Sequence, residues 1–419
     1  MTDTHPAPAA PTAAPKAAAS GSGSFRDYVS NWLARVRAGD TGALPVIAGL
    51  ILLAIIFQTL NSNFLTAGNL VNLMVQGSVY MLFSLGMIFI LLLGEIDLSI
   101  GFIGGVAGVI MAMLVFGTSP LPWFVGVGAG LLAGAAIGFL NGVIITGIGL
   151  PAFIVTLAGL LAWNGVMLII LGNGGTIPIN DQVIVNLANG LLDPTVGWVV
   201  GAILVLIICG DMVLSARRRR HALEPQSILW LKVAAIIVGG IIVVALCNAN
   251  RGRAVPIEGV PWVLLIVFGF AWLWTTVLKR TRFGTYVYAI GGNAEAARRA
   301  GIAVNRIRIA VFTIAGFMGA VAGIIYASRL RSVSTNLDGG QLVLYCIAAA
   351  VIGGTSLFGG RGKAISAILG GLVIASIDNG MGLLGLSAAA RYVVTGIVLV
   401  VAVTIDALAS RGRASSGLG

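Results

Sequence analysis

Side chains that carry charge or could hydrogen-bond a polar ligand are few in this chain, and several stand inside or beside apolar runs. Glu95, Asp97 and Ser99 follow one such run, whereas Asp378 and Asn379 lie within another. A charge at the centre of a bilayer costs upward of about 2.5 kcal/mol, so acids in such places are typical of a solute or proton pathway. We predict that these residues line a path through the membrane. For Glu95 and Asp97 the alternative is a short turn at the membrane surface.

Neutral polar and aromatic side chains add further candidate ligand contacts. Asn141, Asn164 and Gln76 could hydrogen-bond the hydroxyl groups of a solute, and Trp163 could stack on its face. Packing between helices explains each of these residues equally well. Asp211, which also lies inside an apolar run, is another candidate.

The sequence offers no set of residues for catalysis or metal binding. The two histidines, His5 and His221, are far apart in the chain, and the three cysteines have no CxxC spacing. The nucleotide-binding P-loop, Gly-x-x-x-x-Gly-Lys-Ser/Thr, is also missing, because the pair Gly362-Lys363 is followed by alanine. We therefore predict a protein that is not an enzyme, with no catalytic residues, no metal and no cofactor.

The elements that carry these residues must be membrane helices. The 419-residue chain is 58% hydrophobic and 9% charged, with a mean hydropathy of +1.02, whereas a soluble domain has about 25% charged residues. We predict an all-α polytopic membrane protein in contact with membrane lipid. Nucleic acid is not expected as a partner, because the net charge of +11 comes from basic residues between apolar runs and not from one basic face.

A helix needs about 20 apolar residues to cross the bilayer core, which predicts about 10 to 12 transmembrane helices here. The approximate candidate spans are 44–60, 70–93, 100–117, 122–141, 151–171, 196–214, 228–247, 260–278, 307–328, 341–359, 364–383 and 391–409. Glycine interrupts the third and the tenth of these spans. We expect broken or re-entrant segments there.

The basic residues predict the orientation. With the N-terminus inside, most of the 25 lysines and arginines fall in cytoplasmic segments, as the positive-inside rule requires. We therefore predict that both termini are cytoplasmic and that residues 172–195, which include no basic residue, face outward. That segment is either part of a docking surface for an external partner or a hydrated loop.

The chain divides into a long transmembrane domain and short flanking regions. Residues 1–24, rich in Ala and Pro, are predicted to be disordered. Residues 25–43 are predicted to form an interfacial helix or, alternatively, a solvated leader. Residues 44–409 form the transmembrane domain and residues 410–419 a cytoplasmic tail.

The cytoplasmic loop 279–306 is predicted to contain one short helix. Residues 294–300 are good helix formers, Asn293 can cap their start, and Gly301 can end them in the left-handed conformation. The arginines of this helix would be free to contact acidic groups of a partner. The alternative is a simple connector with an amphipathic turn.

Three blocks of sequence are similar to one known family. They are RFGTYVYAIGGN followed by EAARRAGI in 282–302, GEIDLSIG in 94–101, and AVIGGTSLFGGRGK in 350–363 with NGMGLLGLS in 379–387. Together they resemble the monosaccharide permeases of the ribose and xylose type, which are membrane subunits of ATP-binding cassette importers. The likeness extends over about residues 44–409. The segments 94–101 and 353–360 also share glycines at both ends, which suggests two related halves.

The resemblance implies a coupling loop that includes Gly292, Asn293, Glu295, Ala296, Ala297, Arg298 and Gly301. It implies three partners: a cytoplasmic ATP-binding cassette subunit, a periplasmic or extracellular sugar-binding protein, and a second permease copy in a homodimer. The implied function is that of the membrane-spanning permease subunit of an ATP-driven monosaccharide importer in the cell (inner) membrane, working by alternating access. Residues 208–259, with the cluster Arg217–Arg220, look inserted relative to ribose-type permeases, which indicates D-xylose as the substrate.

Two other classes of function stay open at this stage. An ion-coupled secondary sugar carrier would use Glu95 or Asp97 to take up a proton, and it would transport without any ATPase. A membrane scaffold or receptor would give no solute flux even with all partners present.

Overall fold

The computed structural model describes residues 44–172, 175–218, 226–252, 255–335 and 339–415. The predicted disordered tail, the predicted interfacial helix, part of the Arg217–Arg220 cluster and the last residues of the chain lie outside these ranges.

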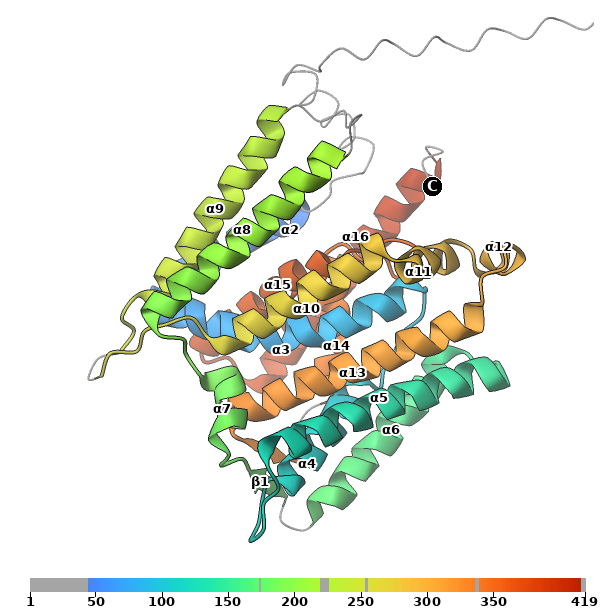
Figure 1. Cartoon of the computed structure of the whole chain (residues 1–419), viewed down its shortest axis with the longest axis horizontal. Coiled ribbons are helices and arrows are strands. Elements are labelled where there is room, and N and C mark those ends of the chain that lie inside the picture. Colours follow the sequence, from blue (N-terminus) through green and yellow to red (C-terminus); the bar gives the residue numbers. More distant parts are fainter. Residues whose placement is uncertain (1–43, 173–174, 219–225, 253–254, 336–338, 416–419) are drawn as a thin grey trace, which may run out of the picture.

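Apolar helices occupy each of the predicted spans, and this confirms the prediction of an all-α membrane protein (Figure 1). Within the described residues, eight helices are long and apolar enough to cross a membrane. They are α3 (Ala67–Leu92), α5 (Trp123–Ile148), α6 (Ala152–Leu171), α8 (Pro194–Arg218), α9 (Gln226–Asn248), α10 (Trp262–Arg280), α13 (Val304–Leu330) and α15 (Ala364–Leu383). Further apolar helices are α2 (Leu44–Leu60), α4 (Ile100–Leu114), α14 (Gly339–Ile352) and α16 (Ala388–Ser415).

The helices α4 and α14, where the glycines led us to expect broken or re-entrant segments, are continuous but short. They have 15 and 14 residues. At 1.5 Å per residue they are therefore about 22 Å and 21 Å long, less than the roughly 30 Å of the hydrocarbon core. Most of their side chains are buried, so longer helices enclose both of them.

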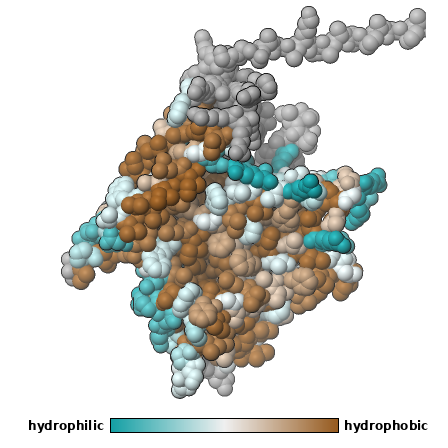
Figure 2. Space-filling model, viewed as in Figure 1, coloured by the Kyte–Doolittle hydropathy of each residue, from teal (hydrophilic) through white to brown (hydrophobic). Residues whose placement is uncertain are grey.

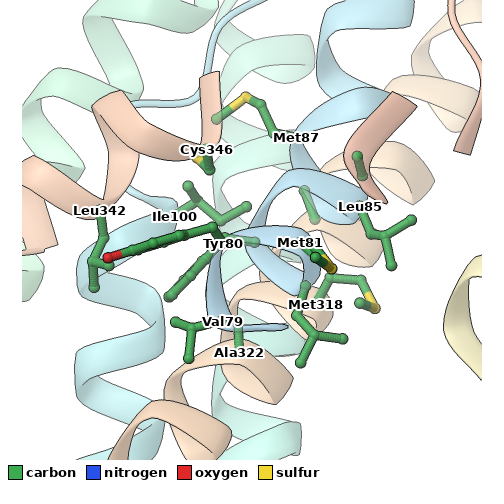
Figure 3. Packing of buried hydrophobic residues seen from close by; sticks show 14 of the residues in the cluster. Val79, Tyr80, Met81, Leu85, Met87, Ile100, Met318, Ala322, Leu342 and Cys346 are labelled. Atoms are coloured by element: carbon green, nitrogen blue, oxygen red, sulfur yellow. The ribbon is translucent and has the colours of Figure 1, made fainter. Parts of the chain in front are cut away.

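The helix α3 forms the centre of the bundle and packs on α4, α10, α13, α14 and α15. Figure 3 shows Met81 and Leu85 of α3 near Met318 of α13, while Tyr80 reaches toward Leu342 of α14. Nearly every residue of α3 from Gly77 to its end is buried. A helix that is apolar on all sides and buried is expected in the middle of such a bundle.

Glycines bring α5 and α13 into close contact. A Cβ atom added at Gly138 would lie 2.2 Å from the carbonyl oxygen of Phe312, and one added at Gly316 would lie 2.3 Å from that of Gly134. Small residues allow this approach in a membrane, where close packing replaces the hydrophobic drive between helices.

The hairpin of α8 and α9 stands beside the rest of the bundle (Figure 1). Most side chains of both helices are at least partly exposed, as expected for helices that face lipid. The hairpin contacts the bundle through α3 and through an ion pair between Asp211 and Arg280 of α10. Much of the segment 208–259, which looks inserted in the sequence, belongs to this hairpin.

Residues 175–195 of the segment predicted to face outward pack against other parts of the protein. Its strand β1 (Thr176–Pro178) pairs antiparallel with β2 (Ser332–Ser334), and its helix α7 (Gln182–Asn189) buries Ile184, Val185 and Ala188. Figure 2 shows hydrophilic residues on two opposite edges of the molecule and a brown apolar band between them. This distribution is typical of a membrane-spanning protein.

Candidate functional site

The short helix α12 (Ala294–Arg299) forms where the sequence predicts it. The Asn293 side chain caps it by accepting a hydrogen bond of 2.9 Å from the Ala296 N–H. Gly301 follows with φ = 82°, a left-handed conformation that favours glycine. Both predicted helix signals are therefore confirmed.

The exposed side of α12 carries charges that pair with one another. Arg298 and Arg299 contact the carboxylate of Glu295 at 2.9 Å and 3.2 Å. Gly292 is exposed as well, whereas Ala297 is buried against the protein. The two arginines are exposed but share one acid, because residues three and four positions apart lie on the same helix face. Their contact with acidic groups of a partner stays a prediction.

A second helix, α11 (Arg282–Gly292), precedes α12, whereas the sequence led us to expect only one helix in this loop. Thr281 caps α11 by accepting a hydrogen bond from the Gly284 N–H. Its buried positions are Gly284, Val287 and Ile290. This spacing of three residues gives one buried helix face, and the polar and glycine residues between these positions concealed the pattern.

Three backbone segments meet beneath α11. The Gly360 N–H donates to the Leu92 carbonyl at 2.9 Å, and a Cβ atom at Gly291 would lie 1.7 Å from that same carbonyl oxygen. The Tyr288 hydroxyl donates to the Gly362 carbonyl at 2.7 Å. The similar segments 94–101 and 353–360 thus lie against each other, since a Cβ at Gly94 would be 3.3 Å from the Phe358 carbonyl oxygen.

Glu95 lies in the turn between α3 and α4 and forms an ion pair with Arg308 in the second turn of α13. The Glu95 side chain is 9% exposed and that of Arg308 is 32% exposed. Burial raises the pKa of Glu95 above its usual value, and the positive charge of Arg308 partly offsets this rise. The pair joins the turn after α3 to the helix that follows the α12 segment.

Asp97 is fully buried two residues further on. Its Oδ1 accepts hydrogen bonds from the Ser99 N–H at 2.8 Å and from the Ser99 hydroxyl at 2.7 Å. Asn141 of α5 donates to the Ser99 hydroxyl at 3.1 Å. Burial raises the pKa of Asp97, and the hydrogen bonds from Ser99 oppose the rise. In the part of the chain that the structure describes, Asp97 Oδ2 has no hydrogen-bond partner.

Asp378 of α15 forms a separate polar group. It accepts hydrogen bonds from Gln76 and Tyr80 of α3, the latter at 2.7 Å, and faces Arg391 of α16 at 3.7 Å. The neighbouring Asn379 accepts a hydrogen bond of 2.8 Å from Asn69. Asp378 and Asn379 therefore lie together, but they belong to a different place from Glu95 and Asp97.

The remaining predicted residues are dispersed. Asn164 is half-buried on α6, and among the described residues no hydrogen bond joins it to either group. The Trp163 indole N–H is buried and has no hydrogen-bond partner within the described ranges. Asp211 is about half exposed and pairs with Arg280.

Sequence reasoning missed Arg308, Tyr80 and Arg391 as partners of these acids. Arg308 was hidden among the basic residues of a cytoplasmic loop, and Tyr80 carried no signal inside an apolar run. Arg391 stands alone at the start of the last apolar run, which was a signal that could have been used.

Comparison with known proteins places the chain in a family. Residues 69–403 match the family described as branched-chain amino acid transport system / permease component. The chain is 37% identical over 374 residues to the xylose transport system permease protein XylH of Escherichia coli K12, a match that covers 87% of this chain and 92% of the relative. It is 35% identical over 371 residues to XylH of Haemophilus influenzae, covering 87% of this chain and 95% of that relative.

The ribose import permease protein RbsC of Escherichia coli K12 is 33% identical over 361 residues, covering 86% of this chain and 92% of the relative. No solved structure gives a significant match. The family model and the relatives each span the central helices and the α11–α12 segment. The chain is therefore a multi-pass membrane permease component and belongs to this transport-system family.

Proposed function

We propose that this chain is the membrane-spanning permease subunit of an ATP-driven monosaccharide importer, with D-xylose as its substrate. The observation that carries the proposal is the similarity to XylH over nearly the whole length of both chains. The family description names branched-chain amino acids and a relative is named for ribose, so membership alone does not select the sugar. The higher identity to XylH favours D-xylose.

Coupling to a cytoplasmic ATP-binding cassette subunit is assigned to α12. This helix exposes Glu295, Arg298 and Arg299 and is attached to the bundle through the buried Ala297. ATP binding would close the ATPase pair and displace α11 and α12 together. The displacement would reach the turn at Glu95 through Arg308, and the loop at Gly362 through Tyr288. The helices would then change between outward and inward access.

Two further partners complete the proposed transporter. A second permease copy forms the homodimer, and a periplasmic or extracellular sugar-binding protein delivers the substrate to the end of the bundle that carries α7. Asp181 and Asp193 lie at the starts of α7 and α8, at that end of the bundle. The polar groups at Asp97 and Asp378 are assigned to the translocation path.

The experiment that tests this function is uptake of labelled xylose and ribose into proteoliposomes that contain the permease, its ATPase and its binding protein. We expect uptake to require ATP and the binding protein, and to fall at least about fivefold in Gly301→Asp and in Glu295→Lys, as expected for loss of coupling between sites. Gly117→Asp is the matched control, because Gly117 also has a positive φ and open surroundings but lies between α4 and α5. Equal losses in Gly301→Asp and Gly117→Asp would contradict the role of α12.

An ion-coupled carrier is the second candidate, and Asp97 supplies the observation that favours it. A fully buried carboxyl group with one unpartnered oxygen could exchange a proton during transport. This alternative predicts uptake driven by a pH gradient in vesicles without the ATPase, and loss of that uptake in Asp97→Asn. Uptake that depends on ATP and is indifferent to the pH gradient would exclude it.

A further inference from the structure

Asp378 holds one carboxylate oxygen in a rigid arrangement. Its Oδ2 accepts hydrogen bonds from the Gln76 amide and from the Tyr80 hydroxyl, the latter at 2.7 Å. Both donors belong to the central helix α3, and Tyr80 is buried. Hydrogen bonds to a charged acceptor are among the stronger ones in proteins, so Asp378 has a fixed position on α15.

The second oxygen of Asp378 is held differently. Its Oδ1 faces Arg391 Nη1 at 3.7 Å, which is longer than a hydrogen bond. Arg391 lies in the first turn of α16, and its Nε donates to the Leu386 carbonyl at 3.2 Å. Two polar atoms at this separation can both contact one hydroxyl or water that lies beside them. The pair therefore presents an acceptor and a donor to one bridging group.

The site is accessible from one side. The side chain of Asp378 is 12% exposed and that of Arg391 is 33% exposed. Tyr345 of α14 covers the other side: its ring lies edge-on to Tyr80, with centroids 5.2 Å apart, and its hydroxyl accepts a hydrogen bond of 2.7 Å from Gln341. A few fixed polar groups beside aromatic rings are typical of sites for small polar ligands.

The site lies away from α12. The helix α15 begins at Ala364, close to the loop at Gly362 that Tyr288 of α11 contacts. Asp378 is five residues before the opposite end of α15 at Leu383. In the proposed orientation, it is therefore in the outer half of the membrane.

We propose that Asp378 Oδ1 and the Arg391 guanidinium bind one hydroxyl group of the transported monosaccharide. The hydroxyl lies beside the two side chains, donates to the carboxylate and accepts from the guanidinium. Gln76 and Tyr80 are positioning residues that hold the carboxylate. The inference rests on the proposed function, because it takes its ligand from the importer.

The test combines one variant with a set of sugars that each lack one hydroxyl. ATP-driven uptake of D-xylose and of its mono-deoxy analogues is measured for the wild type and for Asp378→Asn in the complete transporter, with binding protein loaded to saturation. We expect Asp378→Asn to lower D-xylose uptake by about tenfold or more, in line with hydrogen bonds to charged groups. For one deoxy analogue, wild type and variant should be transported equally slowly, because the hydroxyl that Asp378 binds is missing.

The controls separate this proposal from other causes. Ser376→Ala, on the same helix, removes a hydroxyl that donates to the Leu372 carbonyl of its own helix and should leave the analogue pattern unchanged. Basal ATP hydrolysis and co-purification of the ATPase report assembly. If the Asp378→Asn transporter fails to assemble, Tyr80→Phe and Arg391→Lys are tested in its place. Each should reduce the difference in uptake between D-xylose and the one deoxy analogue that lacks the bound hydroxyl.

Two results would overturn the proposal. One is a loss of uptake that is equal for D-xylose and every deoxy analogue, which would assign Asp378 a structural role; the other is no loss at all. Absence of ATP-dependent uptake in the wild type would instead reject the proposed function itself, so the two failures are distinguishable.

Discussion

At the scale of single residues, the ion pair between Glu95 and Arg308 connects two parts of the chain that are distant in sequence. Glu95 follows the central helix α3, and Arg308 belongs to the helix that begins after α12. Because Glu95 is nearly buried, loss of its partner leaves a charge in an unfavourable place. Removal of Arg308 should lower the free energy of unfolding by less than the roughly 3–5 kcal/mol lost when a fully buried pair is broken, since the Arg308 side chain is 32% exposed.

We predict that Arg308→Gln uncouples transport from ATP hydrolysis. The complex should still hydrolyse ATP, while ATP-driven sugar uptake should fall about fivefold or more, because the movement of α12 no longer reaches the turn at Glu95. Arg306→Gln is the matched control, since Arg306 is exposed two positions earlier on α13. Both activities are measured on the same proteoliposomes.

The reversed pair Glu95→Lys with Arg308→Glu supplies the second control. It should recover part of the uptake that either single change removes, as coupled charges do in double-mutant cycles. If the double variant is no better than the single variants, or if Arg306→Gln has the same effect as Arg308→Gln, the ion pair has no role in coupling.

Local residue signals were predictable and long-range partners were not. Asn293 and Gly301 could be assigned from the sequence because a helix cap depends on a few adjacent residues. The partners of Asp378 lie on another helix, some 300 positions earlier in the chain, and one sequence has no information on that pairing. The sequence showed only that an acid inside an apolar run needs a partner.

At the scale of helices, glycine determines how closely α5 and α13 approach. The close contacts at Gly138 and Gly316 leave no room for a side chain. Gly128 lies on the same helix α5 but has open surroundings. A comparison of Gly138 with Gly128 therefore separates the effect of packing from the effect of helix propensity. Helix propensity favours alanine over glycine at both positions by about 0.5–1 kcal/mol.

We predict that Gly138→Ala destabilises the protein by about 1–3 kcal/mol, the usual effect of overpacking. Gly128→Ala should be neutral or slightly stabilising. Thermal unfolding of the two variants in the same detergent checks the difference. An equal effect of both substitutions would show that the contact between α5 and α13 is not tight.

The sequence predicted where membrane helices occur better than it predicted their lengths or the helices within loops. The apolar runs gave every span, and interruption by glycine marked the short helices α4 and α14. The helix α11 was missed because its buried face contains Gly284 beside Val287 and Ile290. Its packing, and not its own composition, determines that it forms.

At the scale of the whole molecule, the polar edges define two ends of the bundle. One end carries α12, and the other carries α7 and the short sheet of β1 and β2. From the positive-inside rule we predict that the α12 end is cytoplasmic.

Cysteine labelling tests this orientation. In a chain whose three cysteines, Cys209, Cys247 and Cys346, are replaced, Gln182→Cys on α7 should react with an impermeant maleimide in intact cells. Ala300→Cys beside α12 should react only after the membrane is permeabilised. Both positions are exposed, so access to the reagent decides the result. The reverse pattern would place α12 outside and reject the proposed coupling.

The two short, enclosed helices also constrain how the protein is made. The helix α4 packs against α13, yet α4 ends at Leu114 and α13 begins at Val304. At about 5–20 residues per second, the ribosome reaches α13 roughly 10 to 40 s after α4. During that interval a segment too short to span the bilayer can pack on the next helix, α5, but lacks its contact with α13. We therefore expect substitutions at the contact between α4 and α13 to affect membrane assembly as well as the stability of the finished protein.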